Sequence, residues 1–303
     1  MIQCDEGLAY LYAEKERADM IKISTMTTTF RDHREDGMFT SYPESIRRCR
    51  AAGFEVLDLN MCSMSKAGTN ELCGDDWERY VDDIITERDR QGIQFYQSHL
   101  PFRNASIVKF DDPLAEAFFW DMEHRALEIT AKVGAKWAVV HPVYIPGEDD
   151  WQKQIEHNHR IYDGLVEHAA KLGVGIAFEN MVEFDQSRHR FAAYSEEMIA
   201  LCDDYHCETV GLCWDFGHAN TAMPERHAEG LRSLGKRLKC VLTFTPLADE
   251  DRVLQKLVVP TLWMSVWLWE SREFFCTRSS PVYPRVTQKT PNKHPVTYTE
   301  PGR

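Results

Sequence analysis

Polar residues that could hold a metal ion stand at the ends of five consecutive apolar segments of the chain. In chain order these end residues are Asn60, His99, His141, the pair Glu179 and Asn180, and Asp215, which His218 follows three residues later. Glutamate, aspartate and histidine together provide the oxygen and nitrogen ligands that suit Mn²⁺, Mg²⁺, Co²⁺ or Zn²⁺. If the segments converge in space, this pattern indicates a divalent-metal centre.

Each of these residues also has a simpler explanation when it is taken alone. A single histidine at the end of a strand is more often a hydrogen-bonded structural residue, and Asp215 could cap the turn that follows it. Glu179 is harder to explain in this way, because a carboxylate directly after the apolar run VGIAF ends a buried strand and needs a partner. The repetition at successive segment ends therefore favours a shared site.

The elements that carry these residues follow a repeating pattern. A helix-like stretch ends at a glycine or a short polar turn, and runs of β-branched and aromatic residues start near residues 20, 54, 93, 136, 174, 210 and 238. Such alternation predicts a parallel sheet covered by helices, with a first strand over 20–30. The chain lacks the G-x-G-x-x-G loop typical of a doubly wound sheet, whereas a (β/α)8 barrel brings all strand ends to one mouth. We therefore predict a (β/α)8 TIM-type barrel.

Composition and charge argue against several classes of function. The 303 residues are 43% hydrophobic and carry a net charge of −13, which argues against nucleic acid as a partner. No window approaches the roughly 18 consecutive apolar residues of a membrane span, and we expect no secretory leader and no membrane partner. The nine cysteines include no C-x-x-C pair, which predicts reduced thiols and a cytoplasmic protein.

Four short motifs, in this order and spacing, resemble a known family. They are SHLPF (98–102), VVHP (139–142), FEN (178–180) and WDFGHAN (214–220). Over roughly residues 20–240 the chain is similar to the xylose-isomerase-like TIM-barrel superfamily, which contains sugar phosphate isomerases and epimerases, with endonuclease IV as a relative.

The resemblance implies a residue-by-residue assignment of the site. Glu179 and Asp215 match the family's ligands to one divalent metal ion, and Glu179 also matches its catalytic base. The family's substrate-binding positions match His99, His141, His218 and Asn180. In endonuclease IV, the positions of His99 and His141 are metal ligands instead. The implied reaction is a proton transfer through an ene-diolate of a sugar or sugar phosphate. A homo-oligomer is compatible with the sequence.

The resemblance ends after Cys240. Family members carry a histidine on strand seven and a glutamate at the end of strand eight, whereas CVLTFTPL (240–247) holds no histidine and His294 is the one histidine beyond it. Residues 241–303 contain seven of the 13 prolines but one of the 16 glycines. We therefore divide the chain into an N-terminal extension (1–19), a barrel domain (20–247) and an atypical, partly disordered C-terminal segment (248–303).

The abrupt change in composition leads to a hypothesis about the C-terminal segment. A shifted reading frame or a mis-joined exon would explain it, and finding no H-x-H-D-like strand in the other two frames of the gene would count against it. The expected consequences are weak metal binding, impaired turnover and a barrel that is irregular or open at strands seven and eight. Two alternative functions stay open beside the isomerase/epimerase: an endonuclease IV-like metallo-phosphodiesterase and a non-catalytic barrel.

Overall fold

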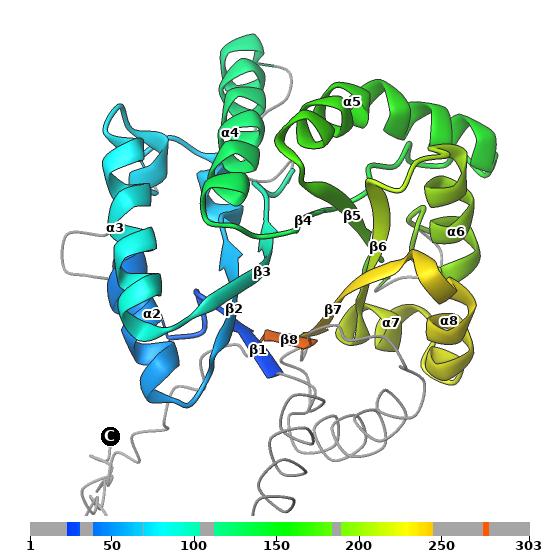
Figure 1. Cartoon of the computed structure of the whole chain (residues 1–303). Coiled ribbons are helices and arrows are strands. Elements are labelled where there is room, and N and C mark those ends of the chain that lie inside the picture. The colour runs from blue at the N-terminus through cyan, green and yellow to red at the C-terminus, as the bar shows by residue number, and fades with distance from the viewer. Residues whose placement is uncertain are drawn as a thin grey trace, which may run out of the picture.

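The computed structural model describes residues 23–30, 39–68, 70–103, 112–183, 189–244 and 275–278. The expected N-terminal extension (1–19) lies outside these residues, and so does the C-terminal segment (248–303) apart from one short strand. The described residues form a ring of parallel strands surrounded by helices (Figure 1). Within these residues, no helix combines the length and the apolar character needed to cross a membrane.

Eight parallel strands follow one another around the ring in chain order, and the last pairs with the first. The strands are β1 (Ile23–Met26), β2 (Val56–Asn60), β3 (Gln94–His99), β4 (Trp137–Val140), β5 (Gly175–Glu179), β6 (Val210–Asp215), β7 (Leu238–Phe244) and β8 (Phe275–Arg278). All eight pairings between neighbours are parallel. The (β/α)8 barrel predicted from the sequence is therefore confirmed.

Helices connect most of these strands on the outside of the ring. The helices are α2 (Tyr42–Ala51), α3 (Trp77–Gln91), α4 (Pro113–Lys132), α5 (Trp151–Leu172), α6 (Ser195–Asp204), α7 (Phe216–Ala222) and α8 (His227–Leu234), with short 3₁₀ turns η1 (Cys62–Ser65), η2 (Glu71–Cys73) and η4 (Gly235–Arg237). Glycines end α3 and α5 in the left-handed conformation, with φ of 64° at Gly92 and 73° at Gly173. Only glycine adopts this conformation without steric cost, which is why glycine marked these helix ends in the sequence.

The first strand ends earlier than the sequence predicts. Of the expected strand over 20–30, the structure describes residues 23–30, which form a four-residue strand followed by a turn at 27–30. The Thr29 amide donates to the Met26 carbonyl (3.0 Å), and the Thr25 and Thr29 hydroxyls are 2.8 Å apart. These local bonds bend the chain away from the strand direction, because threonine side chains compete with the ladder for hydrogen bonds.

The barrel closes through a strand that the sequence did not predict. β8 pairs with β7 from Val241↔Phe275 to Phe244↔Arg278 and with β1 from Ile23↔Phe275 to Thr25↔Thr277. The described strands thus form a closed ring, so of the two expected forms, irregular or open, they do not show the open one. The irregularity expected at strand seven is present as a register shift between β6 and β7 at Leu212/Cys213.

Two apolar clusters fill the molecule on either side of the sheet. The smaller one fills the inside of the ring with one or two residues from most strands: Met26, Val56, Tyr96, Val139, Ala177, Cys213, Cys240 and Leu242. The larger one lies between the ring and the helices. Successive residues of a strand point alternately to the inside and the outside of the ring. A polar residue that points inward at the carboxyl end of a strand therefore faces the mouth of the barrel.

Candidate metal and acid–base site

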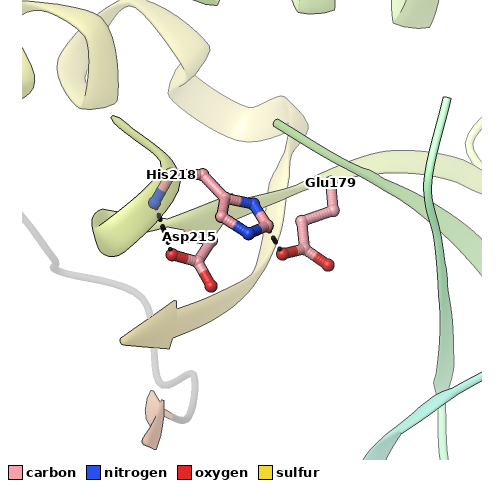
Figure 2. Close-up of side chains that lie close together, drawn as sticks. All are labelled: Glu179, Asp215 and His218. Atoms are coloured by element: carbon pink, nitrogen blue, oxygen red, sulfur yellow. Dashed lines mark hydrogen bonds and ion pairs between the residues drawn. The ribbon is translucent and has the colours of Figure 1, made fainter. Parts of the chain in front are cut away.

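Three potential metal ligands meet at the carboxyl ends of β5 and β6. Glu179 is the last residue of β5, Asp215 is the last residue of β6, and His218 lies in the first turn of α7 (Figure 2). The two strands are neighbours, and Glu179 is paired in register with Cys213. One ligand atom from each of the three residues lies within 4.8 Å of the other two. The convergence inferred from the sequence is therefore present.

Backbone contacts hold this cluster in place. The Asp215 carboxylate accepts a hydrogen bond from the His218 amide (2.9 Å) and so caps the first turn of α7. The His218 Nδ1 atom lies 2.8 Å from the Asn180 carbonyl oxygen and 3.1 Å from Glu179 Oε1. The capping role considered for Asp215 and its place in the cluster are thus compatible, because its two carboxylate oxygens can serve different partners.

Two further histidines face the other oxygen of Glu179. The His141 Nε2 atom lies 2.9 Å from Glu179 Oε2, and the His99 Nε2 atom lies 3.4 Å from the same oxygen. The Tyr162 hydroxyl donates to the His141 carbonyl (2.6 Å), and Phe102 packs edge-on against the His141 ring. Glu179 is therefore a buried carboxylate with three histidines around it.

Asn180 has a role in the structure that the sequence did not reveal. Its side-chain amide donates to the Asp215 carbonyl (3.0 Å) and accepts from the Asp215 amide (2.6 Å). This reciprocal pair ties the end of β5 to the end of β6. A contact between Asn180 and a substrate stays a prediction.

The electrostatics of the cluster keep the carboxylate ionised. Burial alone raises the pKa of Glu179, but the adjacent His141, His218 and His99 outweigh it and hold this pKa well below 4.5. Burial lowers the pKa of His218, but the carboxylates of Asp215 and Glu179 raise it to about 9. For His141 burial prevails, and its pKa is lowered from 6.5. A carboxylate base beside a protonated His218 is the result in the metal-free protein.

The residues of the cluster fit a divalent cation. Glu179 and Asp215 are completely buried, and His218 is 8% exposed. Two buried carboxylates require positive charge beside them, because an uncompensated buried anion costs several kcal/mol, by rough estimate. Glu179 Oε1 has no hydrogen-bond donor of good geometry among the described residues. Two carboxylate oxygens and an imidazole nitrogen form a ligand set that suits Mn²⁺, Co²⁺ or Zn²⁺.

The positions on strands seven and eight add no such ligand. β7 reads LKCVLTF and β8 reads FCTR, so neither strand carries a histidine or a carboxylate. Two carboxylates of the segment between these strands, Glu270 and Glu273, lie outside the described residues, and so does His294. Among the residues that the structure describes, the cluster thus rests on β5, β6 and α7.

Sequence reasoning missed one buried acid beside the cluster. Asp58 lies in the middle of β2, is completely buried, and lies 2.7 Å from His99 Nδ1 through its Oδ2 atom. Asp58 stands two residues before Asn60, so its side chain points to the same side of the strand. This spacing is the feature of the sequence that could have identified Asp58. His189, in the loop after β5, lies between Glu183 (2.8 Å) and Glu197 (2.6 Å), and these two carboxylates disfavour an anionic substrate there.

Solved structures of similar fold include sugar epimerases. A D-tagatose 3-epimerase-like protein shares 18% identity, with 86% of this chain and 92% of that chain covered and a TM-score of 0.58. The 3-keto-D-glucoside 4-epimerase of E. coli shares 13% identity over 88% and 94% of the two chains, with a TM-score of 0.59. A family 2 AP endonuclease of Brucella melitensis shares 14% identity over 87% and 95%, with a TM-score of 0.58. At these identities the likeness establishes the fold alone.

Sequence comparison adds one relative and one family. An uncharacterized protein of Methanocaldococcus jannaschii is 27% identical over 157 residues, which is 50% of this chain and about half (51%) of the length of that relative. The sequence model described as "Xylose isomerase-like TIM barrel" matches residues 46–242, and it ends within two residues of the point where the motif resemblance ends. That match covers well over half of the chain and spans β2 to β7, including Glu179, Asp215 and His218. The chain therefore belongs to the xylose isomerase-like TIM barrel family.

Proposed function

We propose that the protein is a divalent-metal-dependent isomerase or epimerase that acts on a sugar or sugar phosphate by proton transfer through an ene-diolate. The observation that carries this proposal is the ionised, fully buried Glu179, which lies within 4.8 Å of Asp215 and His218 and is flanked by His99 and His141. Epimerases among the structures of similar fold support the same class of reaction.

Some residues of the site would hold the metal ion, and others would bind the substrate or transfer the proton. Glu179 and Asp215 would hold the metal ion, which when bound would polarise the carbonyl and the adjacent hydroxyl of the substrate. A Glu179 oxygen would take the proton from the carbon next to the carbonyl, because its low pKa keeps it ionised. His141 and His99 would contact the sugar oxygens above Glu179, and Asn180 and His218 would complete the substrate contacts.

Isomerisation and epimerisation differ in where the proton returns to the ene-diolate. Isomerisation returns the proton to the neighbouring carbon on the same face of the ene-diolate, so one carboxylate suffices. Epimerisation requires a second acid/base group on the opposite face, which family members are expected to place on strand eight. β8 carries no carboxylate, so the products of the reaction will show whether another residue serves.

Titration calorimetry of the metal-free protein with Mn²⁺ tests the metal site. We expect one bound ion, weaker binding in Asp215→Asn, and unchanged binding in Glu123→Gln, which alters a buried carboxyl group on α4. Incubation with D-psicose and D-tagatose in D₂O should then incorporate deuterium at the carbon next to the carbonyl. Failure to bind Mn²⁺, Mg²⁺, Co²⁺ or Zn²⁺ would refute the proposal.

A phosphodiesterase of the AP endonuclease type is the second candidate. The observation that favours it is the position of His99 and His141 at the same oxygen of Glu179, together with the fold of the Brucella melitensis protein. The net charge of −13 disfavours a nucleic-acid substrate. Several bound zinc ions and cleavage of abasic DNA would replace the first proposal with this one.

The state of the cysteines supports a proposal about the cellular compartment. The seven cysteines that the structure describes are unbridged: Cys49, Cys62, Cys73, Cys202, Cys207, Cys213 and Cys240. Burial raises the pKa of Cys49 to about 12 and that of Cys202 to about 11, so these thiols are unreactive. We propose that the protein resides in the reducing cytoplasm, and these free thiols support that location.

A further inference from the structure

Asp58 lies inside the barrel next to the site without belonging to the metal-ligand cluster. Its Oδ2 atom accepts a hydrogen bond from Gln97 Nε2 (2.7 Å) and lies 2.7 Å from His99 Nδ1. Asp58 is completely buried and His99 is 2% exposed. A buried carboxylate is costly unless it is hydrogen-bonded, so Asp58 depends on its contacts with Gln97 and His99.

An irregular register between β2 and β3 creates this contact. Leu57 pairs with Phe95, but Asp58 pairs with Gln97, so Tyr96 is an extra residue in β3. A bulge of this kind changes which side chains face inward beyond it, and bulges are frequent beside active sites. Beyond the bulge, Gln97 and His99 both reach Asp58.

Ser98, between Gln97 and His99, shows that the side chains on the two faces of β3 have separate partners. The Ser98 hydroxyl lies 2.6 Å from the hydroxyl of Thr130 on α4, outside the ring. His99, one position later, faces Asp58 and Glu179 inside the ring. β3 therefore contributes a polar contact on each face, and only the inner contact, between His99 and Asp58, adjoins the site.

The two nitrogen atoms of His99 have unequal partners. Nδ1 is held at 2.7 Å by Asp58, whereas Nε2 lies 3.4 Å from Glu179 Oε2 and makes no hydrogen bond of good geometry with any described residue. A buried ring nitrogen without a partner is destabilising. Because His99 Nε2 lies beside the carboxylate of Glu179, a group from outside the chain could form a hydrogen bond with it there.

We propose that Asp58 is a positioning residue, which keeps a proton on His99 Nδ1 and fixes the ring so that Nε2 meets a substrate oxygen beside Glu179. This inference rests on the proposed function and adds to it the residue that orients one of its substrate contacts. A carboxylate on the far nitrogen of a functional histidine fixes both the tautomer and the ring orientation. Removing such a partner typically costs about 10- to 100-fold in activity.

The first test reads the His99 ring directly and needs no substrate. In ¹⁵N-histidine-labelled, metal-free protein, the His99 signal is assigned by its loss in His99→Gln. We expect a protonated Nδ1 whose hydrogen exchanges slowly, because it is buried and bonded to Asp58. Asp58→Asn should shift both ring nitrogens, whereas Thr130→Val, which breaks the pair on the other face of β3, should leave them unchanged. An unprotonated Nδ1 in the wild-type protein would overturn the proposal, even if the Asp58→Asn variant failed to fold.

The second test measures turnover of the sugar that the wild-type protein accepts. Asp58→Asn should lower kcat/KM about 10- to 100-fold, and it should cause no further loss in a His99→Gln background, because it acts through that ring. Thr130→Val should keep the wild-type kcat/KM. Equal losses with and without His99 would refute the positioning role. If the wild-type protein turns over no sugar, the proposed function fails, and the ring signals still decide whether Asp58 sets the state of His99.

Discussion

The raised pKa of His218 predicts how the metal-free protein loses stability in alkali. His218 Nδ1 lies 2.8 Å from the Asn180 carbonyl and 3.1 Å from Glu179 Oε1, and Asp215 adds a second anion. A pKa raised from 6.5 to about 9 by folding corresponds to about 3 kcal/mol of stability. Because the folded pKa is the higher one, this contribution is fully present below pH 6.5 and is lost as the pH rises through about 9. Glu179, with its lowered pKa, stays ionised throughout this window.

Urea unfolding between pH 6.5 and about pH 10, with a chelator present, measures this contribution. The wild-type protein should lose about 3 kcal/mol more than His218→Gln over this range, and the two curves should converge at the alkaline end. Thr130→Val changes no titratable group, so its curve should run parallel to the wild-type curve. Parallel curves for the wild-type protein and His218→Gln would refute the reasoning, because the alkaline loss would then come from other groups.

Four further outcomes follow from the same geometry. Mn²⁺ affinity should rise with pH up to about 9 and binding should release protons, because the ion and the proton on His218 compete for the negative charge of the same two carboxylates, Glu179 and Asp215. Calorimetry in buffers of different ionisation enthalpy measures both effects. Glu179→Gln should abolish deuterium incorporation while the circular dichroism spectrum stays unchanged, since it removes the base but keeps the shape. Gly175→Ala should lower the free energy of unfolding by about 1–3 kcal/mol, because the added Cβ would overlap the rigid Trp137 ring. Phe178→Ala should cost about 3–5 kcal/mol in chemical denaturation, because the completely buried ring leaves a cavity between the sheet and α5.

The main features of the fold could be predicted because its signals are local. Glycine at helix ends, apolar strand runs and a polar residue after each run are all visible within short windows, and β2 to β7 begin within about three residues of the expected positions. The convergence of Glu179, Asp215 and His218 then follows from parallel strands in one ring. Here a repeated local pattern was sufficient because the architecture repeats as well.

The features that sequence analysis missed depend on non-local pairing. β8 consists of four residues in a segment without a clear strand pattern, and its place is set by two partner strands that are far away in sequence. Asp58 sits inside an apolar run, where only the bulge at Tyr96 gives it its partners, and a change of register leaves no mark in the sequence. The roles of Asn180 and His189 likewise depend on the neighbours that tertiary structure supplies.

The position of β8 has a consequence for the order in which the barrel can be completed during synthesis. Residues 275–278 leave the ribosome about 30 residues after β7, so for a time the nascent chain holds seven strands whose outer edges, on β1 and β7, have no neighbour. Unpaired strand edges are templates for association with other chains. Ribosomes that carry the same message bring such unfinished chains close together, and this interval is when a chaperone would protect them.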